Sequence, residues 1–209
     1  MKNTVLVGGL DIGTSGCKIV LYDADGNFVR DAYAAYDVSR TGGMHEMDAK
    51  ESFQAVKKVI KAADCRNAAA IAVTSFGETF TMLDKNDEPC APSMLYTDPR
   101  GKTQCETLIN RFGAAELAFR TGAKPHEMYS LPKMMWIKET MPEAFAQAEK
   151  IFLMQDYSFH KNVTNYPEIF TELTDSGIDF ANFSAGKLAD STVDGKNYGV
   201  PFDNGATIM

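Results

Sequence analysis

Leu10-Asp11-Ile12-Gly13-Thr14-Ser15-Gly16-Cys17-Lys18 is the stretch that decides the fold. Residues 4–7 before it and residues 19–23 after it are rich in Val, Ile and Leu, which predicts two short strands joined by a tight turn of small residues. Glycine lets a chain approach a ligand closely, and the backbone N–H groups of such a turn can point at an anion. Asp11 ends the first predicted strand, where its carboxylate can hold a magnesium ion against the charge of that anion.

The same turn also permits a purely structural interpretation, because Asp-x-Gly-Thr occurs in ordinary β-hairpins. It is not a Walker loop, since no Gly-Lys-Ser/Thr follows it. It is not a dinucleotide fingerprint either, since that motif needs a helix where this chain continues with a strand. The turn alone leaves anion binding and a plain hairpin open, and the remainder of the chain has to decide between them.

Composition narrows the classes of protein that the chain can belong to. Its 209 residues are 44% hydrophobic and 23% charged, which are ordinary values for a globular protein with a core. The net charge of −7 argues against a nucleic-acid partner and against an anionic membrane surface. The four cysteines lack Cys-x-x-Cys spacing, which is typical of reduced thiols rather than of a zinc site. We therefore expect a cytoplasmic protein that binds no nucleic acid and no membrane.

The order of predicted elements indicates an α/β fold. Residues 28–38 continue as a third strand, and three consecutive antiparallel strands are unlike the βαβ opening of a Rossmann domain. Asp48 has the chemistry of an N-cap for a helix with apolar residues at helical spacing on one face. Residues 68–74 form a continuous apolar run, which predicts a strand buried on both sides.

The second half of the predicted sheet is less regular. Residues 80–83 and 92–96 predict a hairpin whose turn is residues 84–88. Helices follow from residue 102, and residues 150–154 predict a last strand before another helix. We expect a mixed five-stranded sheet whose first three strands are antiparallel, with helices on its faces.

Four short blocks carry a family resemblance. They are Asp11-Ile12-Gly13-Thr14-Ser15, Gly77-Glu78-Thr79, Tyr96-Thr97-Asp98-Pro99-Arg100, and Thr121-Gly122 followed by a Lys-x-x-Trp segment at residues 133–136 and by Pro142-Glu143. In this order and spacing, residues 9–161 resemble the N-terminal domain of the FGGY carbohydrate kinases, the family of glycerol, gluconate and xylulose kinases. Each block alone is a weak signal, and the specificity lies in their combination.

The resemblance implies a ribonuclease-H-like fold of the actin-like ATPase type and ATP-dependent phosphorylation of a sugar or polyol hydroxyl, with Mg²⁺. It assigns metal binding to Asp11, phosphate binding to Gly13, Thr14, Ser15 and Lys18, and substrate binding to Gly77, Glu78, Asp98 and Arg100. Phosphoryl transfer suits such a set, because it needs a neutralised γ-phosphate and fixed polar groups around the acceptor.

Some residues depart from the family pattern, and these departures limit the substrate and the activity that the resemblance implies. Phe76-Gly77 stands where the glycerol kinases have Gln-Arg, which disfavours glycerol itself as the substrate. Lys18 stands where those kinases have an arginine. The family's catalytic Asp base has no counterpart in this chain, so the catalytic residue stays unknown and we expect weak or no turnover from the chain alone.

Structural interpretations of the same residues remain open. Glu78 and Asp98 also fit solvated turn residues, and Arg100 also fits a surface ion pair of little energetic weight. Trp136, beside Met134 and Met135, fits a core position better than a platform for a sugar.

Residues from about 166 onward resemble a different family. Val193-Asp194-Gly195-Lys196-Asn197-Tyr198-Gly199-Val200-Pro201 is similar to a hairpin of extracellular sugar-binding proteins of transport systems. We therefore divide the chain into residues 1–161, an incomplete kinase domain, and residues 162–209, a tail that is either a fused or mis-joined fragment or a divergent insertion. Two alternatives to a kinase remain, a non-catalytic sugar-binding module and an actin-like sensor domain, and a homodimer is possible.

Overall fold

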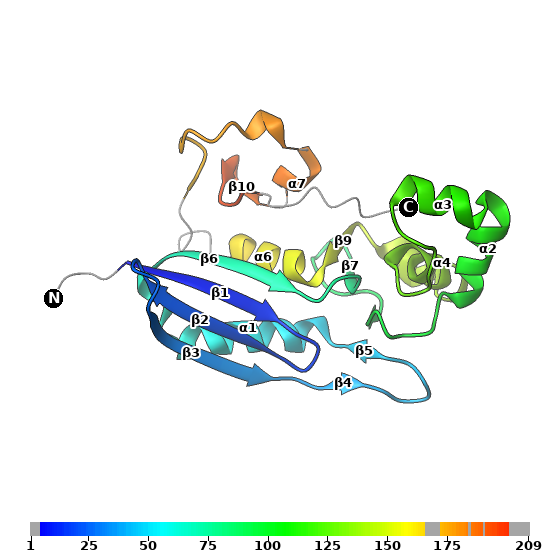
Figure 1. The fold of residues 1–209 in the computed structure, drawn as a ribbon, viewed down its shortest axis with the longest axis horizontal. Helices are drawn as coiled ribbons and strands as arrows, with labels where there is room; N and C mark the ends of the chain where they lie inside the picture. The colour runs from blue at the N-terminus through cyan, green and yellow to red at the C-terminus, as the bar shows by residue number, and fades with distance from the viewer. Residues whose placement is uncertain (1–4, 166–171, 184, 190, 201–209) are drawn as a thin grey trace. The chain divides into compact units, whose positions relative to one another are not determined.

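The computed structural model describes residues 5–165, 172–183, 185–189 and 191–200, which form two compact units divided after Gln155. The strands of the first unit, drawn in Figure 1, are β1 (Leu6–Ile12), β2 (Gly16–Asp23), β3 (Phe28–Ala35), β4 (Val38–Ser39), β5 (Glu46–Met47), β6 (Ala68–Ser75), β7 (Phe80–Leu83), β8 (Ser93–Met94) and β9 (Lys150–Leu153). Its helices are α1 (Ala49–Ala62), α2 (Lys102–Phe112), α3 (Ala114–Thr121), α4 (Ser130–Thr140) and α5 (Pro142–Gln147), and α6 (Met154–Asn165) begins at its end.

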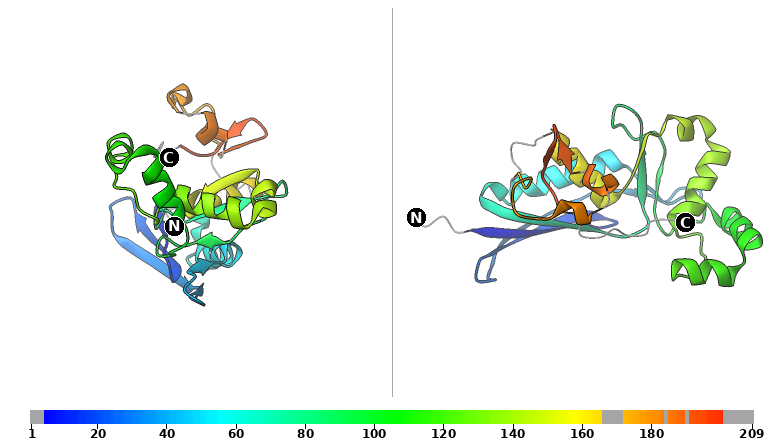
Figure 2. Two further views of the ribbon diagram at one scale, coloured as in Figure 1. Left: turned by 90° about the vertical axis from the view of Figure 1, so that its right-hand side faces the viewer. Right: turned by 90° about the horizontal axis from the view of Figure 1, so that it is seen from above.

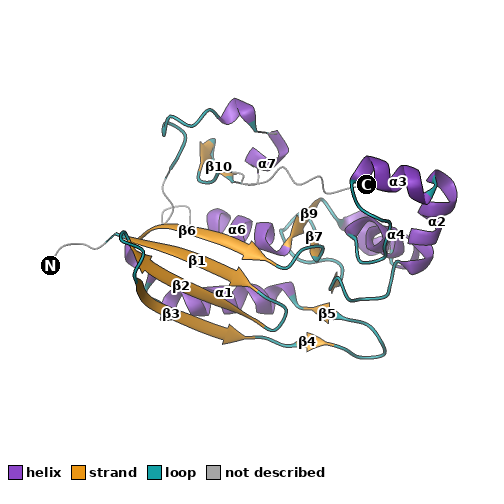
Figure 3. Cartoon of the chain, in the orientation of Figure 1, coloured by secondary structure: helices purple, strands orange, loops and turns teal. Residues whose placement is uncertain are grey.

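The main sheet of the first unit is mixed, as expected. Its strand order is β3-β2-β1-β6, and Figure 3 shows these four strands side by side. β1, β2 and β3 are antiparallel, whereas β6 runs parallel to β1 with Leu10 opposite Val73. The described part of this sheet has four strands and not five. The last predicted strand, β9, pairs antiparallel with β7 outside this sheet, from Phe80 opposite Leu153 to Leu83 opposite Lys150.

The expected second hairpin forms at its turn, where Leu83 pairs with Pro89, but it does not extend to the predicted strand at residues 92–96. The Asp84 amide donates to the Glu88 carbonyl at 2.9 Å, which closes the turn at residues 84–88. The returning strand β8 then pairs with β5, in a three-stranded sheet of order β4-β5-β8. The Cys90 amide still donates to the Met82 carbonyl of β7 at 2.9 Å, and beyond it Pro92 has no backbone N–H to continue that ladder.

The core forms between α1 and one face of the main sheet, and Figures 1 and 2 show the helix lying along that face. Alternate residues of β1 and β2 point to this face, and Ile12 and Ile19 are fully buried there together with Val56 of α1. α1 begins as predicted at Asp48, whose carboxylate accepts hydrogen bonds from the amides of Lys50 and Glu51 at 2.7 and 3.4 Å.

The prediction that residues 68–74 are buried on both sides is wrong. β6 lies at the edge of the main sheet, and Ala70, Ala72 and Thr74 on one of its faces are exposed. The neighbouring positions of β1, Val7 and Gly9, are exposed on the same face. The run is apolar because its residues are mostly small alanines, and small side chains do not by themselves require cover on both faces.

The second unit contains α7 (Ala185–Ala189), β10 (Thr192–Val193) and β11 (Lys196–Asn197). β10 and β11 form the hairpin expected from the sequence, and its turn residues Asp194 and Gly195 have φ values of 50° and 77°. Residues 166–171 and 201–209 of the predicted tail lie outside the described residues. Among the helices that the structure describes, none is long and apolar enough to cross a membrane.

Gly16→Ala should destabilise the protein by about 2 kcal/mol, as overpacking does in a crowded site. A Cβ at Gly16 would lie 2.4 Å from the Tyr33 hydroxyl and 2.6 Å from the Ala34 carbonyl oxygen. The matched control is Gly9→Ala, whose added Cβ would meet nothing within 4 Å. Urea unfolding should give a lower midpoint for the first variant only, and equal midpoints for the two variants would contradict the packing described here.

Candidate functional site

Parallel pairing of β1 with β6 brings two predicted site segments to one edge of the sheet. Ile12 and Ser75, the last residues of the two strands, lie opposite each other. The loop at residues 13–15 follows the first strand, and the segment at residues 76–78 follows the second. The carboxyl ends of parallel strands meet at the same edge, which is where α/β sheets commonly bind ligands.

The loop at residues 13–16 has free hydrogen-bond donors. The Gly13 amide donates to the Gly16 carbonyl at 2.9 Å, which closes the turn. The amides of Thr14 and Ser15 donate no hydrogen bond to any part of the chain that the structure describes. Asp11 is exposed, and its carboxylate has no hydrogen-bond or ion-pair partner among the described residues. Two adjacent N–H groups and a carboxylate are therefore available at this end of the hairpin.

Lys18 forms an ion pair with a residue of β3 in the structure, whereas the family resemblance assigns it to phosphate binding at this loop. Its ammonium group forms an ion pair with Asp31 of β3 at 2.8 Å, and both side chains are exposed. The hydrogen bond from Lys18 to Asp31 raises the pKa of Lys18. An exposed pair of this kind is weak, so it restrains the lysine without fixing it.

Glu78 lies in a conformation that few residues adopt. Its φ is 64°, in the left-handed region that disfavours a side chain. One carboxylate oxygen, Oε2, accepts hydrogen bonds from the amide and the hydroxyl of Ser130, each at 3.1 Å. The other oxygen, Oε1, has no partner among the described residues. The carboxylate is thus held on one side and available on the other.

Asp98 and Arg100 bind each other in a buried cluster. Arg100 donates to Asp98 Oδ1 through its amide and Nε, both at 2.9 Å, and to Oδ2 through Nη2 at 2.6 Å. The His45 amide also donates to Oδ2 of Asp98, at 2.7 Å. Arg100 forms a second ion pair with Glu46, at 2.7 Å. These bonds fill the four acceptor positions of the Asp98 carboxylate.

This arrangement corrects two interpretations drawn from the sequence. Asp98 has a side chain with no exposed surface, so it is not a solvated turn residue. Arg100 is 11% exposed, so it is not a surface ion pair. Burial by itself raises the pKa of Asp98, but the hydrogen bonds from Arg100 and from the His45 amide outweigh it and leave that pKa below its ordinary value.

Helix α4 connects these parts. Ser130 in its first turn holds Glu78, and Trp136 two turns later stacks on the Arg100 guanidinium, 4.9 Å from the ring centre. Trp136 also packs against the core cluster around Phe80 and Ile137, which confirms its predicted core position. Gly101 lies against the same helix, because a Cβ there would approach the Lys133 amide to 3.1 Å.

Lys133 is a fully buried lysine in the middle of this arrangement. Its ammonium group donates to the carbonyls of Glu127 and Met128 at 2.8 and 2.9 Å, which ties the loop before α4 to the helix. Burial lowers the pKa of Lys133 to about 8, against the attraction of Asp98 and Glu78. The sequence shows this lysine only as part of the Lys-x-x-Trp pattern.

Three residues of this site were not predicted from the sequence, and they are His45, Glu46 and Ser130. Ser130 meets Glu78 across 52 positions of the chain, and the His45 amide meets Asp98 across 53 positions. No local pattern in the sequence signals contacts of such separation.

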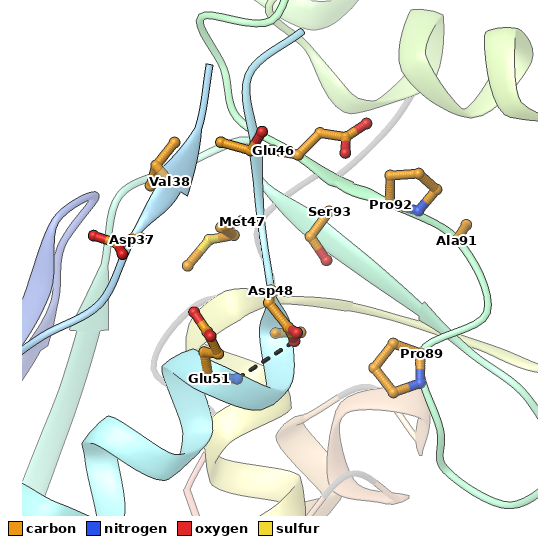
Figure 4. A pocket seen from close by; sticks show the side chains of 12 residues that line it. Asp37, Val38, Glu46, Met47, Asp48, Glu51, Pro89, Ala91, Pro92 and Ser93 are labelled. Atoms are coloured by element: carbon orange, nitrogen blue, oxygen red, sulfur yellow. Dashed lines mark hydrogen bonds between the residues drawn. The ribbon is translucent and has the colours of Figure 1, made fainter. Parts of the chain in front are cut away.

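A pocket of about 480 Å³ lies beside this site, and Figure 4 shows it. Its lining comes from β4, β5, the start of α1 and the segment before β8, and it includes the carboxylates of Asp37, Glu46, Asp48 and Glu51. None of the predicted site residues lines it. A pocket with these four carboxylates does not suit a phosphate group, because like charges repel.

Asp98→Asn should lower the free energy of unfolding at pH 7 by about 3 kcal/mol, since it leaves Arg100 buried with only Glu46 as a charged partner. The pKa of Asp98 is lowered in the folded protein, so its contribution is present above the ordinary Asp pKa of about 4 and is lost as the pH falls further. Urea unfolding of both proteins at pH 7 and at lower pH should show the difference shrinking in acid. A difference that is constant with pH would contradict the assignment.

Asp31→Asn should lower the pKa of Lys18 towards its ordinary value, because the hydrogen bond that raises it is weakened. The lysine side-chain signals can be titrated by NMR in both proteins. Asp25→Asn removes a carboxylate from the turn before β3 and should leave Lys18 unchanged. An unchanged Lys18 pKa in the first variant would mean that the ion pair does not persist in solution.

Comparison with known proteins identifies the family. A family model for the N-terminal domain of the FGGY family of carbohydrate kinases matches residues 6–194, beyond the limit of 161 expected from the sequence. The chain is 29% identical over 175 residues to a xylulose kinase of Lactococcus lactis, covering 80% of this chain and 34% of the relative. It is 27% identical over 167 residues to a gluconokinase of Bacillus subtilis, covering 76% and 32%.

Solved structures agree with the sequence comparison. Gluconate kinase from Lactobacillus acidophilus superposes with a TM-score of 0.71 at 29% identity, covering 76% of this chain and 33% of that one. Ligand-bound xylulose kinase from the same organism gives a TM-score of 0.70 at 29% identity, covering 75% and 33%. The chain spans about a third of the length of these relatives. The chain belongs to the FGGY family of carbohydrate kinases, of which it contains N-terminal domain sequence.

Proposed function

We propose that this chain is the sugar-binding part of an ATP-dependent carbohydrate kinase, which transfers a phosphoryl group to a sugar hydroxyl. One observation carries the proposal. The Thr14 and Ser15 amides and Glu78 Oε1, which have no partner among the described residues, belong to segments that follow adjacent parallel strands. An anion-binding loop and a hydroxyl acceptor at one edge of a sheet are what phosphoryl transfer between ATP and a sugar needs.

The loop residues fit the phosphate side of the reaction. The Thr14 and Ser15 amides, with Gly13 leaving room for close approach, would stabilise charge on the transferred phosphoryl group. Asp11 offers one exposed carboxylate, and Mg²⁺ in such sites is held by one or two carboxylates together with phosphate oxygens and water. When bound, the metal would neutralise phosphate charge. Lys18 would join only after leaving Asp31.

On the sugar side, we assign the direct contact to Glu78. Its Oε1 can accept from a hydroxyl while Ser130 holds Oε2. Gly77 beside it leaves open space, since a Cβ there would meet nothing within 4 Å. Asp98 and Arg100 support the site without touching the sugar. The similarity to xylulose kinases and gluconokinases, together with Phe76-Gly77, supports a ketopentose or an aldonic acid rather than glycerol.

The base that accepts the proton of the sugar hydroxyl is not assigned to this chain. Two-domain kinases close over the substrate to exclude water, and the relatives extend well beyond the length matched here. We propose that this chain binds sugar without efficient turnover and that the working enzyme is cytoplasmic. That residues 162–209 form a separate segment stays a prediction, and so does the formation of a homodimer.

Titration calorimetry of the 209-residue chain against pentoses, ketoses, hexoses, polyols and aldonic acids tests the proposal. One sugar class should bind, and Glu78→Gln should weaken that binding about tenfold, as expected for the loss of a hydrogen bond to a charged group. Glu116→Gln, a surface carboxylate paired with Arg120, is the matched control and should bind as wild type does.

Coupled ADP release with Mg-ATP, measured on the same samples, separates the alternatives. Binding without turnover agrees with the proposal, whereas sugar-dependent turnover would place a base within this chain. Absence of binding to every sugar would refute a sugar-binding role for the chain. Binding that Glu78→Gln leaves unchanged would move the sugar site away from Glu78.

A further inference from the structure

Two carbonyl groups of the loop at residues 13–16, those of Gly13 and Ser15, accept hydrogen bonds from outside the loop. The Gly13 carbonyl accepts a hydrogen bond from the Tyr36 hydroxyl. The Ser15 carbonyl accepts two, from the Tyr33 hydroxyl at 3.1 Å and from the Tyr36 amide at 3.3 Å. Both tyrosines come from β3 or the residue that follows it, about twenty positions along the chain.

Occupied carbonyls matter because a peptide carbonyl oxygen carries partial negative charge and repels an anion, whereas an N–H group attracts one. A turn is better suited to phosphate when its N–H groups are available to the ligand and neighbouring carbonyl groups are engaged elsewhere. Here the carbonyls of Gly13 and Ser15 are engaged, and the amides of Thr14 and Ser15 have no partner in the described ranges.

We propose that Tyr33 and Tyr36 are positioning residues that make the 13–16 loop an anion site, by binding the Gly13 and Ser15 carbonyl groups and so presenting the Thr14 and Ser15 amides to a phosphate. The inference rests on the proposed function, since it names the residues that prepare that function's phosphate loop. It adds two side chains that none of the four sequence blocks contains.

The two tyrosines act from different environments. Tyr33 is 61% exposed and Tyr36 is 9% exposed, so the loop is held both from the solvent side and from the buried side. The absence of a side chain at Gly16 leaves room for the Tyr33 hydroxyl to bind the Ser15 carbonyl, because a Cβ at Gly16 would lie 2.4 Å from that hydroxyl. Burial raises the pKa of Tyr36 to about 12, so this hydroxyl remains a donor at neutral pH.

The test uses Tyr33→Phe, Tyr36→Phe and the double variant of the full chain, with pyrophosphate as the probe. Tyr22→Phe, an exposed tyrosine on β2 of the same sheet, is the matched control. NMR titration should shift the Thr14 and Ser15 amide signals of the wild type, which is the signature of N–H groups binding the anion. The double variant should bind about tenfold more weakly and lose those shifts while the rest of its spectrum is retained.

Each outcome bears on the inference in a distinct way. Equal binding by the wild type and the double variant would overturn it and leave the proposed phosphate loop intact. No pyrophosphate binding by the wild type would overturn both. Weaker binding with unchanged amide shifts would show an effect elsewhere in the protein and would also overturn it. A loss confined to the tyrosine variants, with Tyr22→Phe unaffected, supports it.

Discussion

The parallel pairing of β1 with β6 is the constraint on which the rest of the candidate site depends. It aligns the ends of two strands that lie more than sixty positions apart in the chain, Ile12 opposite Ser75. Without it, the Gly13–Ser15 loop would be the end of an isolated hairpin and Glu78 would be a residue in a remote turn. An antiparallel arrangement of the same strands would have put their following segments at opposite edges.

A second requirement is rigidity around Glu78, where we propose that sugar binds, and α4 supplies it. Ser130, Lys133 and Trp136 lie about one turn apart on this helix and bind Glu78, the preceding loop and Arg100 respectively. Arg100 in turn fixes Asp98 and Glu46. Burying such charges is unfavourable unless each has partners, and in this cluster each charged group has them. The helix thus converts several separate loops into one framework for a ligand.

Much of the fold followed from local sequence, and most of the site chemistry did not. The Asp11–Ser15 turn, the three antiparallel strands and the Asp48 helix cap all depend on neighbouring residues, so their patterns were readable. The partner of β9, the exposed face of β6 and the bonds to Asp98 depend on which segments meet in space. The sequence placed Asp98 and Arg100 in the site, but only the structure shows that they satisfy each other.

The left-handed backbone at Glu78 has an evolutionary consequence. Glycine would adopt that φ of 64° without strain, and many proteins place glycine or asparagine at such positions. A glutamate there has some conformational cost, which the proposed contact of its carboxylate with a sugar would offset. Selection for stability alone would favour glycine at this position, so under the proposed function a related chain with glycine here is expected to bind sugar more weakly.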